Sequence, residues 1–349
     1  MTTYVDQWRR RKSEAFDLAA NSTGGRTVDI DLWGVPRTIY ANANLSIYSA
    51  QACNARCAFC VEELRPASRG TALVYQKSVE QDDARYFAAL ESTLRALAPL
   101  NPSLSITGGE PSIDPRLPRI LRTVSAHAPR KLVMTTNGSG LLQKGPEGRP
   151  LDHLIAAGAQ HLNLSRAHWD DRLNARLMGF KDAPDAEALR AIVRTARAGG
   201  LRVRLSCVLL ADAVDDLEDV LGYLEFARSV GVDNVIFRRL MQVDRATVEE
   251  NYVVRYCDQA AIALEPLLDQ LGTRPDFTLQ QQIVGYYYYV EVWRWHDVDV
   301  VFEEADLAQL EHTKRTMPGV IHELIFHPNA RLASTWQPWD GVLGPLEPG

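Results

Sequence analysis

The sequence lacks the features that mark membrane, secreted and nucleic-acid-binding proteins. Across 349 residues no uninterrupted apolar run approaches the length of a membrane span, and the N-terminus has no apolar stretch of a signal peptide. The formal charge is -6, and the one notable basic cluster runs from Arg9 to Lys12. This leaves no electrostatic footprint for nucleic acid or an anionic membrane surface. We therefore predict a cytoplasmic protein with a small-molecule partner, no nucleic acid and no membrane.

Cysteine is also scarce, but it is clustered. Three of the five cysteines are Cys53, Cys57 and Cys60, with the spacing C-x3-C-x2-C. In a reducing compartment such a cluster indicates metal binding or chemistry rather than disulfides. A structural zinc site takes four protein ligands, whereas an iron-sulfur cluster can leave one iron to a non-protein ligand. The spacing favours a cluster with an open position; zinc completed by a distant residue and incidental thiols stay as alternatives.

The pattern of apolar residues predicts an α/β protein. Composition is ordinary for a globular chain, with 46% hydrophobic and 23% charged residues. From about residue 44 to 242, short β-rich runs alternate with amphipathic helical windows. The expected strands lie at 45–49, 104–109, 131–138, 161–165, 203–210 and 234–241. Such βα repeats form a parallel sheet, open or curved into a partial barrel, with ligands at the C-terminal edge of its strands.

The segments before and after the core differ from it in their sequence pattern. Before the core we expect a helix and a strand at 28–40, and after it one helix at 251–271. The patterns at 286–304 and 320–336 alternate like antiparallel strands. We divide the chain into an N-terminal extension (1–43), a core (44–245) and a C-terminal α+β extension (246–349). The tyrosines at 286–289 indicate cross-strand packing or a plug that closes the substrate side.

The stretch "CNARCAFC" resembles the cluster-binding signature of the radical S-adenosylmethionine (SAM) superfamily. The resemblance implies a partial (β/α)6 TIM-like barrel in which Cys53, Cys57 and Cys60 hold one 4Fe-4S cluster. SAM would chelate the fourth iron through its amino and carboxylate groups. The reduced cluster would cleave SAM to a 5'-deoxyadenosyl radical, which takes a hydrogen atom from the substrate. An external one-electron reductant, such as flavodoxin or ferredoxin, is implied as a partner.

The same resemblance implies residues that bind SAM. Phe59, before the last cysteine, would pack near the adenine or serve as a core aromatic. The turn "GGE" after the second strand resembles the family motif that contacts the SAM ammonium, here Gly108, Gly109 and Glu110. Its glycines permit close backbone approach to a ligand. Asn137, in "TNG" after the third strand, is either a further cofactor contact or part of an ordinary Asn-Gly turn.

Strands four and five supply the remaining candidates. Ser165 and Arg166 end the fourth strand, where relatives contact the ribose or carboxylate of SAM; Arg166 could instead form a surface salt bridge. Ser206 lies where relatives carry a polar SAM contact. Side chains alternate along a strand, so Ser206 and Cys207 must point to opposite faces. Cys207 could donate a hydrogen atom to a product radical if it faced the lumen, and is otherwise a small core residue.

The sixth strand resembles that of the molybdenum-cofactor GTP cyclase branch. Beyond the triad only Cys207 and Cys257 remain. The cysteine-rich extension that carries auxiliary clusters in those relatives is therefore not expected, and we expect a single cluster. We predict a radical SAM enzyme acting on a small polar substrate, a sugar, nucleoside or nucleotide sugar, in natural-product biosynthesis. The alternatives are a peptide-modifying radical SAM enzyme and a non-enzymatic zinc-binding or scaffold protein.

Overall fold

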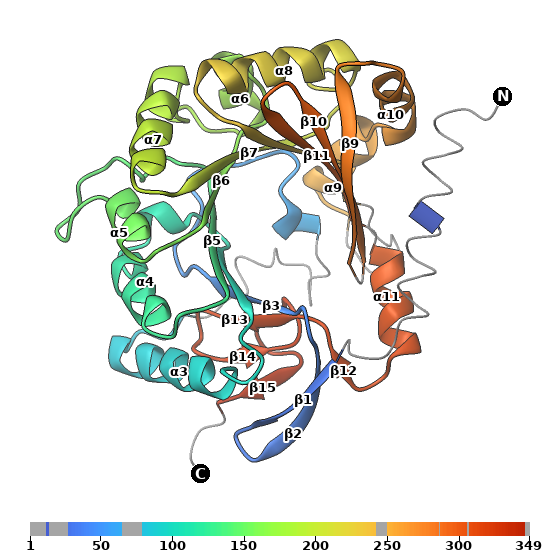
Figure 1. Ribbon diagram of the computed structural model, residues 1–349. Helices are drawn as coiled ribbons and strands as arrows, with labels where there is room; N and C mark the ends of the chain where they lie inside the picture. The colour runs from blue at the N-terminus through green and yellow to red at the C-terminus, as the bar shows by residue number, and fades with distance from the viewer. Residues whose placement is uncertain are drawn as a thin grey trace.

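A twelve-stranded mixed sheet curves through the molecule, and most helices lie on its outer side (Figure 1). The computed structural model describes residues 12–13, 27–64, 79–241, 250–285, 287–305 and 307–345. Arg9 to Arg11, Tyr286 and the predicted boundary at 245 lie outside these ranges. Within them, no helix has both the length and the apolarity to cross a bilayer.

All six predicted core strands are present and parallel. They are β3 (Asn44–Tyr48), β4 (Ser103–Thr107), β5 (Lys131–Thr136), β6 (His161–Ser165), β7 (Arg202–Val208) and β8 (Asn234–Arg238). Each pairs in register with the next along the chain. The predicted βα organisation is therefore confirmed, and the C-terminal ends of these strands share one edge.

Six helices lie between the strands, and four of them begin at an aspartate that caps the helix. They are α3 (Asp83–Ala96), α4 (Leu117–Ser125), α5 (Pro150–Ala156), α6 (Asp171–Leu177), α7 (Ala186–Ala198) and α8 (Leu217–Ser229). Asp82, Asp170, Asp185 and Asp216 accept hydrogen bonds from the first-turn N–H groups of α3, α6, α7 and α8. The seven-residue α6 was not predicted, because it is too short to show a helical period; its cap Asp170 was the available signal.

The C-terminal strands extend both edges of the same sheet. β11 (Val298–Ala305) pairs parallel with β8 and continues antiparallel through β10 (Tyr288–Trp295) to β9 (Phe277–Val284). β13 (Leu324–Phe326) pairs parallel with β3 and continues through β14 (Leu332–Ala333) to β15 (Val342–Gly344). The predicted antiparallel pairs are present. Sequence did not predict that one strand of each group would join the parallel sheet.

Two expected elements are divided in the structure. The run 28–40 is a hairpin of β1 (Thr27–Leu32) and β2 (Val35–Tyr40), which turns at Trp33 and Gly34 and pairs with β12 (Val320–Ile321). The single helix expected at 251–271 is α9 (Tyr252–Ala260) followed by α10 (Leu264–Gly272). Pro266 explains the break, since proline is tolerated in a first helical turn and disrupts a helix interior. A 3-10 helix, η1 (Val61–Leu64), follows the cysteine loop, and α11 (Leu307–Thr316) precedes β12.

The two faces of the parallel sheet differ in chemistry. Leu104, Leu162 and Leu205 belong to the main apolar core, which also contains buried residues of α3, α7 and α8. The alternate side chains, including Ser105, Asn163 and Ser206, are half-buried and point the other way. We call this second face, turned away from the helices, the inner face. Its polar side chains suit contact with a polar ligand better than packing against apolar side chains.

The buried contact between β8 and β11 makes the C-terminal strands part of the main core. Phe302 stacks on Phe237 with 5.4 Å between ring centroids, and both are buried. We expect Phe302→Ala to lower the free energy of unfolding by about 3–5 kcal/mol, because it leaves a large cavity. The control Ile283→Ala, on exposed β9, should change it by less than about 1 kcal/mol. Urea denaturation followed by circular dichroism measures both; equal effects would contradict a shared core.

Candidate active site

The three clustered cysteines lie at the C-terminal edge of the sheet, directly after β3. Cys53 is exposed, and Cys57 and Cys60 are half-buried. The loop is held against the end of α6, since the Arg56 N–H donates to the Met178 carbonyl at 3.0 Å and the Ala58 N–H to the Leu177 carbonyl at 3.5 Å. Backbone hydrogen bonds therefore fix the middle of the loop, and the Ala55 N–H also donates to the Cys53 sulfur at 3.4 Å.

The thiols are close enough to influence one another. Burial, followed by the charges of Cys60 and Cys53, raises the pKa of Cys57. Tetrahedral zinc, with Zn–S bonds of about 2.3 Å, needs sulfur atoms about 3.8 Å apart. Among the described residues, the trio with ligand atoms all within 4.8 Å is Asp215, Asp216 and Asp219, and not the cysteines. At least one pair of the three sulfur atoms is therefore more than 4.8 Å apart, and the all-thiolate donor set fits an iron-sulfur cluster.

The GGE turn packs directly against the cysteine loop. Gly108 and Gly109 have φ of 78° and 50°, and a Cβ on Gly109 would lie 1.8 Å from the Gln51 carbonyl oxygen. A Cβ on Gly108 would meet the Tyr48 ring at 2.3 Å. The close approach predicted for these glycines is therefore made to the protein itself. It brings Glu110 beside the loop, with its N–H donating to Gln51.

Glu110 joins the ends of two neighbouring strands. Its carboxylate is 1% exposed and accepts hydrogen bonds from the Ser112 N–H at 2.9 Å, the Asn137 N–H at 2.7 Å and the Thr136 hydroxyl. A carboxylate has about four acceptor positions, so one stays available for a further donor. The sequence placed Glu110 in the site; its role in holding Asn137 emerges only from the structure.

Asn137 lies next to the first cysteine. Its side-chain amide donates to the Asn54 side-chain oxygen at 2.8 Å and lies 3.9 Å from the Cys53 sulfur. Asn54 in turn donates to the Ser139 hydroxyl at 3.0 Å. The loops after β3, β4 and β5 are thus connected around the thiols. Asn54, which lies inside the cysteine motif, is a positioning residue that the sequence analysis missed.

Comparison with known proteins agrees with this geometry. Residues 47–235, more than half of the chain, match the Radical SAM superfamily. This chain is a radical SAM enzyme. A 4Fe-4S cluster and SAM are accordingly its cofactors, as predicted.

Its relatives support the predicted branch of this superfamily. A GTP 3',8-cyclase of Xanthomonas campestris is 27% identical over 190 residues, covering 54% of this chain and 51% of the relative. One of Stenotrophomonas maltophilia is 29% identical over 231 residues, covering 64% and 62%. The chain thus spans about half to three-fifths of the length of these relatives. Streptococcus suis SuiB bound to the precursor peptide SuiA is 15% identical with a TM-score of 0.50, covering 85% of this chain and 60% of SuiB, which shows a shared fold.

Two further radical SAM candidates meet on the inner face. Ser165 and Ser206 are direct register partners on β6 and β7, and both are half-buried. Phe59 is half-buried and packs between two small apolar clusters, one containing Val254 and the other Met178. Both of its predicted roles, core aromatic and adenine contact, are compatible with that position.

Arg166 does not face the inner side of the sheet, and its predicted contact with SAM is wrong. Its guanidinium is 2% exposed, donates to the carbonyls of Pro184 and Trp169 at 2.9 Å, and pairs with Asp171. It also lies 4.6 Å from the centroid of the Phe226 ring on α8. Arg166 therefore anchors the segment between β6 and α7 behind the sheet. The cause is alternation, since Ser165 already occupies the inner face.

Cys207 also lies behind the sheet, so the condition for its role as hydrogen donor is not met. It is fully buried in the main core, with its sulfur 3.5 Å from the Ala167 carbonyl oxygen and near Tyr223 of α8. Burial raises the pKa of its thiol. Its neighbours identify it as a small core residue.

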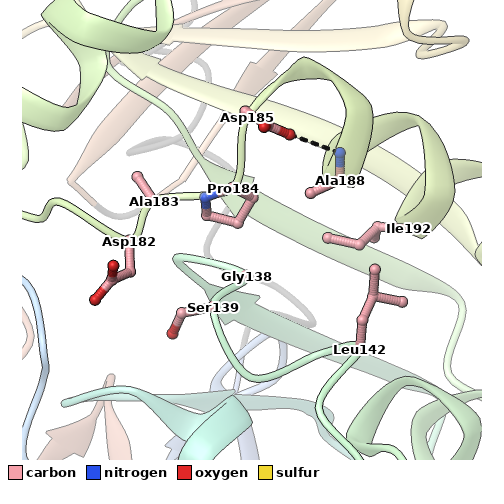
Figure 2. Close-up of a pocket in the computed structure, with 9 residues that line it drawn as sticks. All are labelled: Gly138, Ser139, Leu142, Asp182, Ala183, Pro184, Asp185, Ala188 and Ile192. Carbon is pink, nitrogen blue, oxygen red and sulfur yellow. Dashed lines mark hydrogen bonds between the residues drawn. The ribbon is translucent and has the colours of Figure 1, made fainter.

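A pocket of about 240 Å³ adjoins the site on the outer side, between the loop after β5 and the start of α7. Figure 2 shows Ser139 and Asp182 at one end and Leu142 and Ile192 at the other. Pockets for drug-sized ligands measure about 300–1,000 Å³, so this one is small for SAM. We therefore take the inner face, and not this pocket, as the place of reaction.

The contact between Gly109 and Gln51 yields a test. Gly109→Ala should displace the cysteine loop and sharply reduce iron and sulfide bound per chain, at a stability cost of about 1–3 kcal/mol. Gly158→Ala is the matched control, because Gly158 has φ of 70° with no atom within 4 Å of the added Cβ. Iron and sulfide analysis after anaerobic reconstitution measures the difference. Full cluster content in Gly109→Ala would contradict the tight packing.

The position of Cys207 yields a second test. Cys207→Ala should leave SAM cleavage and product formation unchanged and cost about 1 kcal/mol of stability, because it removes one buried sulfur. Assays of 5'-deoxyadenosine and product, beside a thermal melt, test this. If product formation stopped while SAM cleavage continued, Cys207 would take part in the reaction.

Proposed function

We propose that this radical SAM enzyme cleaves SAM reductively to methionine and a 5'-deoxyadenosyl radical, which abstracts a hydrogen atom from a small polar substrate. The observation that carries the proposal is the meeting of Cys53, Cys57 and Cys60 with Glu110 and Asn137 at one edge of a parallel sheet. Ligands gather at this edge in α/β folds.

Different side chains would hold the cluster and SAM. Cys53, Cys57 and Cys60 would bind three irons and leave the fourth to SAM. The remaining acceptor position of Glu110 suits the SAM ammonium, and the paired hydroxyls of Ser165 and Ser206 suit its ribose. When bound, the reduced cluster supplies the electron that cleaves SAM. The protein's part is to orient the substrate on the inner face and to exclude water.

The inner face and the relatives support a nucleoside or nucleotide as substrate. Half-buried polar side chains such as Asn163 and Ser206 suit hydroxyl and base groups, and the matched relatives are named for a reaction of GTP. The peptide-modifying alternative, a natural-product pathway and the division at 43 and 245 stay predictions. We propose the cytoplasm as location and an external one-electron reductant, flavodoxin or ferredoxin, as partner.

Anaerobic reconstitution tests the chemistry. With iron and sulfide the full chain should develop the brown colour and absorption of a 4Fe-4S cluster. With SAM and dithionite it should then release 5'-deoxyadenosine. A chain that binds zinc instead and releases none would favour the scaffold alternative.

The ligand assignment is tested by Cys57→Ala. This variant should lose the cluster and reduce 5'-deoxyadenosine formation to background, while circular dichroism stays unchanged because the loop is held by backbone bonds. Cys257→Ala is the matched control, since Cys257 is buried in α9 and should not affect the cluster. SAM cleavage by Cys57→Ala would remove Cys57 from the ligand set.

A further inference from the structure

The hydrogen-bond donors of Asn137 all point at the protein. Its backbone N–H donates to the Glu110 carboxylate at 2.7 Å. Its side-chain amide carries two more hydrogens. That amide nitrogen lies 2.8 Å from the Asn54 side-chain oxygen and 3.9 Å from the Cys53 sulfur, so each neighbour can accept one hydrogen. The donors of Asn137 are thus used by Glu110, Asn54 and Cys53, and the last of these is a thiol of the cysteine triad.

A backbone contact fixes which way the Asn137 amide faces. The Ser139 N–H donates to the Asn137 side-chain oxygen at 3.0 Å. A backbone N–H can only donate, so the amide oxygen must face Ser139 and the amide nitrogen must face the opposite side. Cys53 lies on that side. The direction of the donor therefore follows from Ser139 and is independent of the contact with sulfur.

The surroundings of Asn137 hold this orientation. Asn137 is 7% exposed, so water competes little for its amide. The next residue is also held, since the Gly138 N–H donates to the Thr136 hydroxyl at 2.9 Å. Asn54 is fixed in turn by its hydrogen bond to the Ser139 hydroxyl at 3.0 Å. The protein thus orients the amide toward Cys53 by itself.

The Cys53 sulfur is approached by donors from two different loops. The Ala55 N–H, in the loop after β3, lies 3.4 Å from this sulfur. The Asn137 amide comes from the loop after β5. Cys53 is also the exposed member of the triad, whereas Cys57 and Cys60 are half-buried. Protein donors are therefore placed at the thiol that water reaches most easily.

We propose that the Asn137 amide donates a hydrogen bond to the Cys53 thiolate of the bound cluster and so raises the reduction potential of that cluster. The proposal rests on the function above, because it takes Cys53 as a cluster ligand. Hydrogen bonds to the sulfurs are among the factors that set the potential of an iron-sulfur cluster. Such bonds favour the reduced state, since the added electron makes the sulfurs more negative and therefore better acceptors.

The contact changes the energy of electron transfer and not its chemistry. The electron comes from the external one-electron reductant, and Asn137 keeps both of its amide hydrogens. Glu110 acts as a positioning residue for this contact, because it holds the backbone of Asn137. A cluster that is easier to reduce can accept its electron from a weaker reductant.

Asn137→Leu tests the contact, because leucine has the branching of asparagine and no hydrogen-bonding atom in its side chain. In the reconstituted full chain without SAM, the ratio of reduced to oxidised cluster at a fixed solution potential should fall about three- to tenfold, or about 30–60 mV. Asn44→Leu is the matched control, since Asn44 lies at the opposite end of β3, and it should leave the ratio unchanged. Potentiometric titration followed by EPR spectroscopy measures the ratio. Equal ratios in wild type and Asn137→Leu would overturn the proposal.

A second measurement keeps Asn137 in place, and so decides the matter even if Asn137→Leu takes up no cluster. The wild-type chain is labelled with the heavy nitrogen isotope at the side-chain amide of asparagine. Pulsed EPR of its reduced cluster without SAM should show a coupling to the labelled nitrogen. Asn54→Ala, labelled in the same way, should keep this coupling because Ser139 and Glu110 still orient Asn137. No coupling in wild type, or its loss in Asn54→Ala, would overturn the contact.

SAM binding separates this role from a direct contact between Asn137 and SAM. If Asn137 contacted SAM instead, Asn137→Leu would weaken SAM binding and leave the potential of the SAM-free cluster unchanged, and the proposal would be wrong. Failure of the function is seen separately. A wild-type chain whose cluster potential depends on Asn137 but which releases no 5'-deoxyadenosine would overturn the function proposed above and support this contact.

Discussion

The buried carboxylate of Glu110 connects the parts of the active site. It accepts hydrogen bonds from Ser112, Thr136 and Asn137, and so fixes the end of β5 against the turn after β4. That turn packs on Gln51 of the cysteine loop through Gly109. Hydrogen bonds to a charged acceptor contribute about 1.5–3 kcal/mol each, and a carboxylate buried without them would be strongly unfavourable. The position of the cysteine loop therefore depends on the hydrogen bonds of a residue that follows a different strand.

The sheet provides two chemically different ends along one face. At the C-terminal edge lie thiols, backbone amides and Glu110, which suit a cluster and the polar groups of SAM. At the N-terminal end lie the basic side chains of Lys131 and Arg204. Between them are small polar residues such as Ser206. Outer-face residues cannot contribute, as Arg166 and Cys207 show, because their side chains are buried among the helices.

The C-terminal strands other than β12 belong to the same sheet as the core motifs. β11 adds beside β8 and β13 beside β3, so segments distant in sequence protect both edges of the parallel strands. Trp336 meets Tyr48 edge-on at 6.5 Å between ring centroids, which brings the segment after β14 to the end of β3. The Tyr48 hydroxyl in turn donates to Glu62 at 2.8 Å, just after the cysteines. Aromatic packing from this region therefore supports the site.

Much of the fold and of the site could be predicted from sequence because local signals carry it. Alternating periods fixed six strands, and the triad and GGE turn identified the superfamily and the edge where chemistry occurs. The predictions that failed had local and non-local causes. The hairpin at 28–40 and the break before Pro266 needed turn and proline chemistry. Arg166 needed a decision about strand face, which a one-residue shift reverses.

The sequence by itself indicated the cofactors, since the spacing of the three cysteines, together with the GGE turn, resembles the cluster-binding signature of one superfamily. Only the tertiary structure decided which candidates meet. Side-chain direction on a strand depends on which face packs against helices, and the contacts of Glu110 and Asn137 join residues from the ends of different strands. Such contacts are set by register and burial, which arise only when the sheet is assembled.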